Sequence, residues 1–175
     1  FMNWQKTINK LLKRKSGIIK QVLTYDLKSA TISEPICEDV DGDELLEIII
    51  GTQEGDLFAL KETGELAWKF KVMEELSEVD KMFLDAEVSN SINASPTIAD
   101  INNDFRKEIL IGSELGIVYA LNDKGVKLWS YKTKGAIRGK ICVFDIDNDG
   151  KLEIVFGSTD KNIYILSEKG KLLTK

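Results

Sequence analysis

The fold is decided by the stretch Asp39-Val-Asp41-Gly-Asp43-Glu-Leu-Leu-Glu47-Ile-Ile-Ile-Gly51, which the chain repeats twice more. The other copies read Asp100-Ile-Asn102-Asn-Asp104-Phe-Arg-Lys-Glu108-Ile-Leu-Ile-Gly112 and Asp145-Ile-Asp147-Asn-Asp149-Gly-Lys-Leu-Glu153-Ile-Val-Phe-Gly157. A repeat of this kind indicates an array of equivalent units, each too small to bury its apolar face alone. It also puts the same acidic row at three equivalent places.

Each copy contains four short apolar runs separated by turn residues. In the first copy they are Pro35–Cys37, Glu47–Ile50, Leu57–Leu60 and Leu66–Phe70. Because these runs are short and rich in Ile, Val and aromatic residues, they favour strands over helices. Ile48–Ile50 is continuously apolar, so we expect that strand to be buried on both faces. Four antiparallel strands per repeat predict a β-propeller blade.

We therefore predict an all-β fold of β-propeller blades, three four-stranded repeats within residues 17–175, preceded by a short helix. Blade 1 covers about residues 32–71, blade 2 about 92–132 and blade 3 about 137–175. Residues 72–91 form an insertion, which is either a surface excursion or a partner-binding element with a short helix. Residues 18–27 have the composition of one more strand, in the place of the last strand of a preceding blade.

The helix is predicted over residues 3–15. Trp4, Ile8, Leu11 and Leu12 are spaced to share one face of a helix, and Lys and Arg occupy the other face. Such a basic amphipathic helix packs on its own domain or a sister subunit, or it lies on an anionic membrane surface.

Composition narrows the function classes. The 175 residues are 43% apolar, which is typical of a globular protein, and the net charge of −5 argues against nucleic acid as a partner. The chain has no His, which removes the commonest general base and zinc ligand. Cys37 and Cys142 are interpreted as small core residues. Without a visible secretory leader or membrane span, we expect a cytoplasmic protein, or an extracellular one if the chain is a fragment lacking its signal peptide.

Two family resemblances follow from these motifs. The pattern Asp-x-Asp/Asn-x-Asp-x-x-x-Glu, followed by an Ile/Val run and Gly, resembles the FG-GAP-like repeats of integrin-alpha-type propellers. The second half of each unit, Gly-x-Leu/Val-Phe/Tyr-Ala-Leu and then Gly-x-x-x-Trp, is similar to quinoprotein-type propeller repeats. The resemblance covers roughly residues 32–175 and implies a propeller, which can host binding scaffolds or enzymes.

The acidic rows are candidate calcium sites, since calcium takes about six to eight oxygen ligands. The candidate ligands are Asp39, Asp41, Asp43, Glu47, Asp100, Asn102, Asp104, Glu108, Asp145, Asp147, Asp149 and Glu153. The second copy is the weakest in charge. Position 9 carries the last acid, so these are not EF-hands, and the FG-GAP family usually has Asp there. The alternative is that the Asp side chains only cap the turn through backbone bonds.

Trp68 and Trp129 recur at one blade position, which favours packing over ligand stacking. Three blades do not readily close a ring. Either two chains combine as a homodimer, or the chain is part of a longer propeller. We expect a non-enzymatic module that binds or scaffolds a protein partner, with calcium as a structural element. The alternatives are a carbohydrate-binding lectin and a fragment of a quinoprotein- or lyase-like propeller enzyme.

Overall fold

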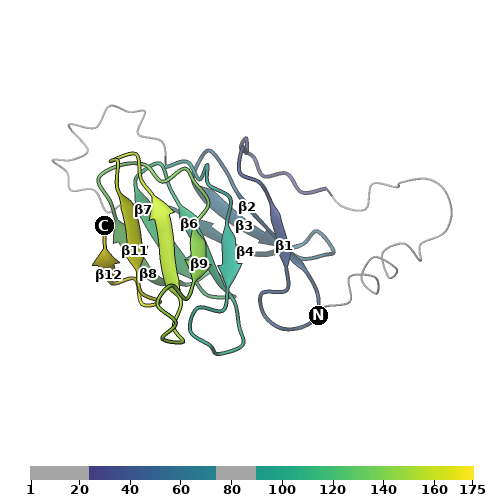
Figure 1. The fold of residues 1–175 in the computed structure, drawn as a ribbon. Coiled ribbons are helices and arrows are strands. Elements are labelled where there is room, and N and C mark those ends of the chain that lie inside the picture. Colours follow the sequence, from purple (N-terminus) through teal and green to yellow (C-terminus); the bar gives the residue numbers. More distant parts are fainter. Residues whose placement is uncertain (1–23, 74–89) are drawn as a thin grey trace, which may run out of the picture.

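The computed structural model describes residues 24–73 and 90–175, which form twelve strands (Figure 1). The strands of blade 1 are β1 (Ile36–Glu38), β2 (Glu47–Gly51), β3 (Asp56–Leu60) and β4 (Leu66–Lys71). Those of blade 2 are β5 (Thr97–Ala99), β6 (Glu108–Gly112), β7 (Ile117–Leu121) and β8 (Lys127–Lys132). Those of blade 3 are β9 (Cys142–Phe144), β10 (Glu153–Gly157), β11 (Ile163–Leu166) and β12 (Leu172–Thr174).

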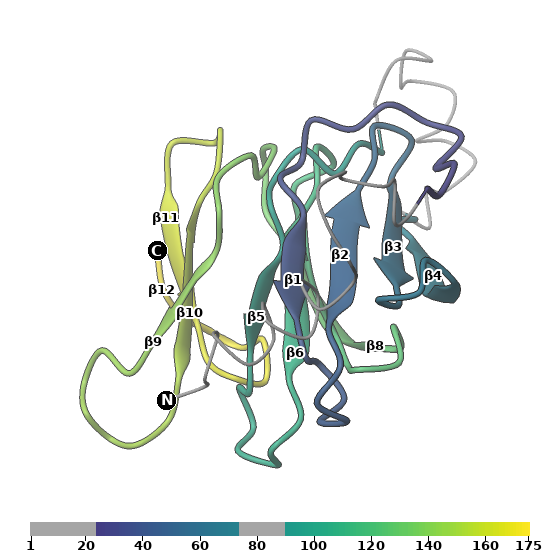
Figure 2. The same ribbon diagram turned by 90° about the vertical axis from the view of Figure 1, so that its right-hand side faces the viewer.

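Each blade is a separate four-stranded sheet in which neighbours along the chain pair antiparallel. Figure 2 shows the three sheets side by side in chain order, as in a segment of a propeller. The loops between the first and second strands of the blades lie on one side of this segment. The predicted three four-stranded units are therefore confirmed.

The core consists of two apolar layers, one at each joint between blades. Blade 2 lies between two neighbours, so β6 and β7 are buried at every residue. In β2 burial alternates, and Ile48 and Ile50 are only half-buried. The prediction that Ile48–Ile50 is buried on both faces is wrong because, within the described residues, no other sheet covers the outer face of blade 1.

The predicted fold class needs correction in its helical part. The described residues contain no helix, so the fold that the structure supports is all-β without the helix predicted to precede the blades. Residues 3–15 lie outside the described residues, as does most of the insertion predicted over 72–91. Residues 24–27, the described end of the strand predicted over 18–27, are not in a strand. No helix that could span a bilayer is found among the described residues.

The two cysteines are also a correction, because both are exposed rather than in the core. Cys37 pairs with Ile48 in blade 1, and Cys142 pairs with Val155 in blade 3. Side chains of directly paired residues lie on the same face of a sheet. Each cysteine therefore lies on a face of an end blade that no other described sheet covers.

The joints between blades use the same contacts twice. Trp68 donates its Nε1–H to the Asp123 carbonyl at 2.8 Å and lies over Gly125, where a Cβ would come within 2.5 Å of the indole. Trp129 makes the equivalent bond to the Glu168 carbonyl at 3.0 Å and lies over Gly170. The packing role predicted for both tryptophans is confirmed.

Candidate cation-binding turns

The acidic rows form the loops that join the first and second strands of each blade. We call residues 39–47, 100–108 and 145–153 turn 1, turn 2 and turn 3, and all three lie on the same side of the molecule (Figure 2). Each turn has two residues in the left-handed region, at its fourth and sixth positions. These residues are Gly42, Glu44, Asn103, Phe105, Asn148 and Gly150. The backbone path is thus the same in the three copies, although only some positions carry the glycine that this region favours.

The first Asp of each turn caps the backbone. Asp39, Asp100 and Asp145 accept the N–H of the sixth residue at 3.0, 2.9 and 3.0 Å. The acid at the fifth position accepts the N–H of the seventh residue at 2.8 Å in all three turns. These bonds satisfy turn donors that would otherwise face only water. The capping role considered from the sequence is therefore present, and it leaves further oxygen lone pairs for another ligand.

The ninth residue is a buried glutamate in every copy. Glu47, Glu108 and Glu153 are 6%, 2% and 7% exposed, although they begin the second strand next to a polar loop. Each accepts the N–H of the turn's second residue through Oε2, at 3.2, 3.0 and 2.8 Å. Burial raises the pKa of Glu47 and Glu108, and the neighbouring Asp carboxylates raise both pKa values further. A cation bound beside these glutamates would lower their pKa values.

Turns 1 and 3 bring three carboxylates together. In turn 1, oxygens of Asp39, Asp41 and Asp43 lie within 4.8 Å of one another. In turn 3 the corresponding group is Asp145, Asp147 and Glu153. Two unit charges about 4 Å apart repel by on the order of 1 kcal/mol even in water, so such a group favours a cation. Hard oxygen ligands at this spacing fit the donor set of calcium.

The two groups are not identical. Asp149, at the fifth position of turn 3, forms an ion pair with Lys151 at 2.8 Å and is not in the group, whereas buried Glu153 is. In turn 1 the fifth-position acid is in the group and Glu47 is not. The predicted four-residue sets are thus brought together only in part.

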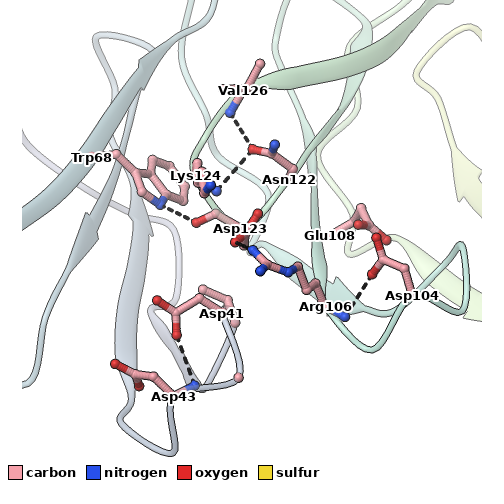
Figure 3. Close-up of polar contacts among 12 residues, drawn as sticks. Asp41, Asp43, Trp68, Asp104, Arg106, Glu108, Asn122, Asp123, Lys124 and Val126 are labelled. Carbon is pink, nitrogen blue, oxygen red and sulfur yellow. Dashed lines mark hydrogen bonds and ion pairs between the residues drawn. The ribbon is translucent and has the colours of Figure 1, made fainter.

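Turn 2 does not gather its acids in this way. The Asn102 side-chain amide donates to Asp104 at 3.2 Å and to Glu108 at 3.3 Å, so protein N–H groups bridge the two carboxylates. Arg106 extends from the turn and donates to Asp123 at 2.7 Å (Figure 3). Asp100, the remaining predicted ligand of turn 2, accepts the backbone N–H groups of Asp104 and Phe105. Only turns 1 and 3 gather three carboxylates among the described residues, and that turn 2 is the weakest cation site stays a prediction.

Two functional candidates were not predicted from the sequence. Asp123, 7% exposed, binds Arg106 through its carboxylate and Trp68 through its carbonyl (Figure 3). It lies in the hairpin between β7 and β8, and only the recurrent Gly two residues later signalled that this hairpin packs closely.

The second is a polar pocket of about 490 Å³ in the part of the chain that the structure describes. It is lined by Gln53, Ser91, Asn93, Glu114 and Arg138. Arg138 binds Glu114 through two bonds of 2.8 and 2.9 Å, and its guanidinium lowers the pKa of Glu114. These two residues are 24 positions apart with no motif between them, so no sequence pattern indicates the pair.

Three antiparallel four-stranded sheets with equivalent joints define a segment of a β-propeller. The sequence matches the family described as "Lambda-carrageenase beta-propeller domain" over residues 19–77 and 75–175, so the chain belongs to this family. A search of curated proteins found no match.

Solved structures show the same fold at low sequence identity. BamB from Moraxella catarrhalis is similar with a TM-score of 0.59 and 17% identity over 87% of this chain and 38% of its own. BBS1N in complex with ARL6DN has a TM-score of 0.52 and 15% identity, over 80% of this chain and 38% of its own. Saccharomyces cerevisiae Sqt1 has a TM-score of 0.53 and 15% identity, over 73% of this chain and 30% of its own. The chain therefore spans less than two fifths of these three structures.

The resemblance predicted from the repeats is confirmed at the level of the β-propeller. The comparisons name neither FG-GAP repeats nor quinoproteins, so these finer assignments stay predictions.

Proposed function

We propose that this chain is a non-enzymatic β-propeller module that binds another protein through the side that carries its acidic turns. The observation that supports this is one exposed apolar side chain in each turn: Leu45, Phe105 and Ile146, which are 36%, 93% and 47% exposed. Exposed apolar side chains among charged residues are typical of protein-binding surfaces. With no His in the chain, no general base of the commonest kind accompanies the acids.

Phe105 is the strongest element of this proposal. It is an almost fully exposed aromatic residue whose φ of 70° lies in the left-handed region, which is costly for a bulky side chain. An exposed and strained aromatic residue does nothing for the fold that Gly would not do better. Aromatic residues are also enriched where interfaces have their largest binding energies.

The surrounding acids predict the partner's chemistry. Turns 1 and 3 carry clustered carboxylates, so a partner with an apolar patch bordered by Lys or Arg would be attracted and oriented. One structure with this fold, BBS1N, was crystallised in complex with ARL6DN. That similarity supports the class of function and does not identify the partner.

We further propose that calcium binds turns 1 and 3 as a structural ion, in the manner of the strand–turn–strand sites of FG-GAP repeats. The residues that would hold it are Asp39, Asp41 and Asp43 in turn 1, and Asp145, Asp147 and Glu153 in turn 3. When bound, calcium would offset the repulsion among these carboxylates and stiffen the turns. Turn 2 would stay without calcium at the same concentration.

The test of protein binding compares three forms as bait in the native lysate: the wild-type chain, Phe105→Ser and Val126→Ser. Val126 is 58% exposed on the hairpin after β7, so its variant is a matched loss of exposed apolar surface elsewhere. We expect a partner that the wild type and Val126→Ser retain and Phe105→Ser loses. Partners retained equally by all three forms would contradict the use of this surface.

A second candidate function is binding of a polysaccharide, which the description of the family favours. Gel retardation in lambda-carrageenan tests it directly, with an unrelated neutral polysaccharide as the control. Retardation that survives Phe105→Ser would favour this function over protein binding.

A further inference from the structure

We propose that the polar pocket around Glu114 and Arg138 binds one sugar residue of a polysaccharide through its hydroxyl groups. The inference rests on the second candidate function, polysaccharide binding, and it gives that function a site and a mode of recognition. The pocket is separate from the surface around Phe105, so sugar binding and protein binding can be tested independently.

The pocket lies at the opposite ends of the strands from the acidic turns. Gln53 and Glu114 belong to the loops that follow β2 and β6, whereas turns 1 and 2 precede these strands (Figure 2). The other lining residues, Ser91, Asn93 and Arg138, belong to the segments that lead into blades 2 and 3. All three blades thus contribute to the pocket, across the two joints inside the chain. Its volume of about 490 Å³ is within the range of about 300–1,000 Å³ that is usual for small-ligand sites.

The repeat places these residues at equivalent positions of successive blades. Gln53 and Glu114 lie fourteen residues after the first Asp of their turns, and Asn93 and Arg138 lie seven residues before the first Asp of theirs. At the second of these positions blade 1 has Ile32, which is 62% exposed. The blade fold therefore does not require a polar side chain there. The amide of Asn93 and the guanidinium of Arg138 call for another explanation, which ligand recognition supplies.

A chain of hydrogen bonds holds the polar groups of the pocket in place. Asn93 Nδ2 donates to Glu114 Oε1 at 2.7 Å, and Arg138 donates to the two Glu114 oxygens at 2.8 and 2.9 Å. Ser91, which is 3% exposed, donates to Asn93 Oδ1. A site whose side chains are already fixed loses less entropy when a ligand binds, so this network favours recognition of a small polar group.

The network leaves both donors and an acceptor for a ligand. Among the described residues, Arg138 uses two of its five N–H groups and Asn93 uses one of its two amide N–H groups. From the same part of the chain, Glu114 accepts two bonds at Oε1 and one at Oε2, so Oε2 keeps a lone pair. Donors and an acceptor that a ligand can use therefore lie side by side in the pocket.

The charges of the pocket favour recognition through uncharged groups. The Arg138 guanidinium lowers the pKa of Glu114, so both side chains stay ionised at neutral pH and their charges cancel within one bidentate pair. Such a pair gives little net attraction to a lone anion or cation. A sugar hydroxyl both donates and accepts, so neighbouring hydroxyls can use the donors of Arg138 and Asn93 together with the acceptor of Glu114.

The test is calorimetric titration of the full chain with oligosaccharides of lambda-carrageenan, the polysaccharide that the description of the family names. We expect the wild type to bind. Arg138→Met and Asn93→Leu should bind at least about tenfold more weakly, since each removes N–H donors that the sugar would use. Lys140→Met is the matched control, because it removes one positive charge from the same exposed segment and Lys140 does not line the pocket.

Salt separates hydroxyl recognition from attraction between the sulfate groups of carrageenan and surface lysines. Raising the ionic strength from about 0.05 to about 0.5 M screens such attraction, whereas hydrogen bonds to hydroxyls in the pocket should persist. The net charge of −5 already opposes an anionic polymer, so the affinity should stay level or rise. A fall in affinity of about tenfold over this range would overturn the proposal.

Far-UV circular dichroism and melting check that each variant keeps its sheets, and Asn93→Leu carries the test if Arg138→Met unfolds. A wild type that does not bind would overturn both this inference and the polysaccharide candidate, and it would leave capture of a protein through Phe105 untouched. Equal binding by the wild type and both pocket variants would overturn the pocket alone, because the polysaccharide would then bind elsewhere on the chain.

Discussion

Turn 2 and turn 3 have the same backbone path and the same capping bonds, yet they balance their charges differently. In turn 3, three carboxylates lie within 4.8 Å of one another, whereas in turn 2 the Asn102 amide bridges Asp104 and Glu108. The shared bonds give the acids a capping role in both turns that does not depend on a bound cation. At the third position, turn 2 has the neutral amide of Asn102 between two carboxylates, whereas turn 3 has the carboxylate of Asp147.

The largest expected effect is the response of wild-type stability to calcium. An ion at about 100 times its dissociation constant stabilises the folded state by about 2.7 kcal/mol per independent site. For a chain of this size that corresponds to a melting temperature higher by roughly 5–10 °C. The variant Asp41→Asn with Asp147→Asn, which puts an amide at the third position of turns 1 and 3, should lose most of this response in calorimetric melting.

Magnesium at the same concentration is the control, since it needs stricter octahedral geometry than these loops offer. An equal rise in melting temperature with either ion, or in the double variant, would remove calcium from the proposed function.

The reverse exchange, Asn102→Asp, should make turn 2 resemble turn 3. It removes two N–H donors from between the carboxylates and adds a negative charge, which should cost about 1–2 kcal/mol in the presence of a chelator. Calcium should recover that loss, because turn 2 would then have a carboxylate at the third position, as turn 3 has. Urea unfolding with and without calcium measures both effects. Destabilisation that calcium does not reverse would show that Asn102 is a purely structural bridge.

Much of the fold could be predicted because the three copies of the repeat can be compared with one another. The positions of Asp39, Gly51 and Trp68 recur with fixed spacing, so the strands, the turns and the packing of the tryptophans follow from comparison of the copies. Burial could not be predicted in the same way. Cys37 and Ile48 look like core residues in sequence, but they lie on the outer face of an end blade, and a local pattern does not say which blade is at the end.

The clustering of the acids could be predicted in part, and their role as cation ligands stays a prediction. The period of the acidic row identified the turns in which carboxylates gather, since the row repeats in each copy. The diversion of Asp149 by Lys151 and the bridge from Arg106 to Asp123 depend on side-chain directions that spacing does not encode. The helix expected over residues 3–15 rested on periodicity alone, and it lies outside the described residues, which contain strands and no helix.

A smaller effect concerns the sixth position, where turn 2 has Phe105 and turn 3 has Gly150, both at positive φ. Left-handed backbone costs a non-glycine residue about 1 kcal/mol, so Phe105→Gly should stabilise the protein by about that amount. Gly150→Phe should destabilise it by a similar amount. Chemical denaturation measures both free energies. A Phe105→Gly variant that loses stability would mean that the phenyl ring packs on the protein and is not available to a partner.

The smallest expected effect concerns Asp160. Neutral hydrogen-bond donors surround this carboxylate, whereas other carboxylates surround the acids of turns 1 and 3. Tyr164 O–H donates to it at 2.6 Å, and with the Asn162 and Lys134 N–H groups lowers the pKa of Asp160 to about 2. A lowered pKa contributes stability that is present above the ordinary value of 3.8 and is lost as pH falls toward 2. Tyr164→Phe keeps the ring and removes the main donor, so the pKa of Asp160 should rise toward 3.8.

Carboxyl ¹³C chemical shifts followed from neutral pH down toward pH 2 measure this directly. Tyr119→Phe is the control, since the Tyr119 hydroxyl donates to the Met73 carbonyl at 3.1 Å. If the Asp160 pKa does not move, the backbone N–H groups alone hold the carboxylate. The same would then be expected of the capping Asp residues in the turns. Their affinity for backbone donors would compete with calcium, and the contrast between turns 2 and 3 would shrink to the charge at the third position.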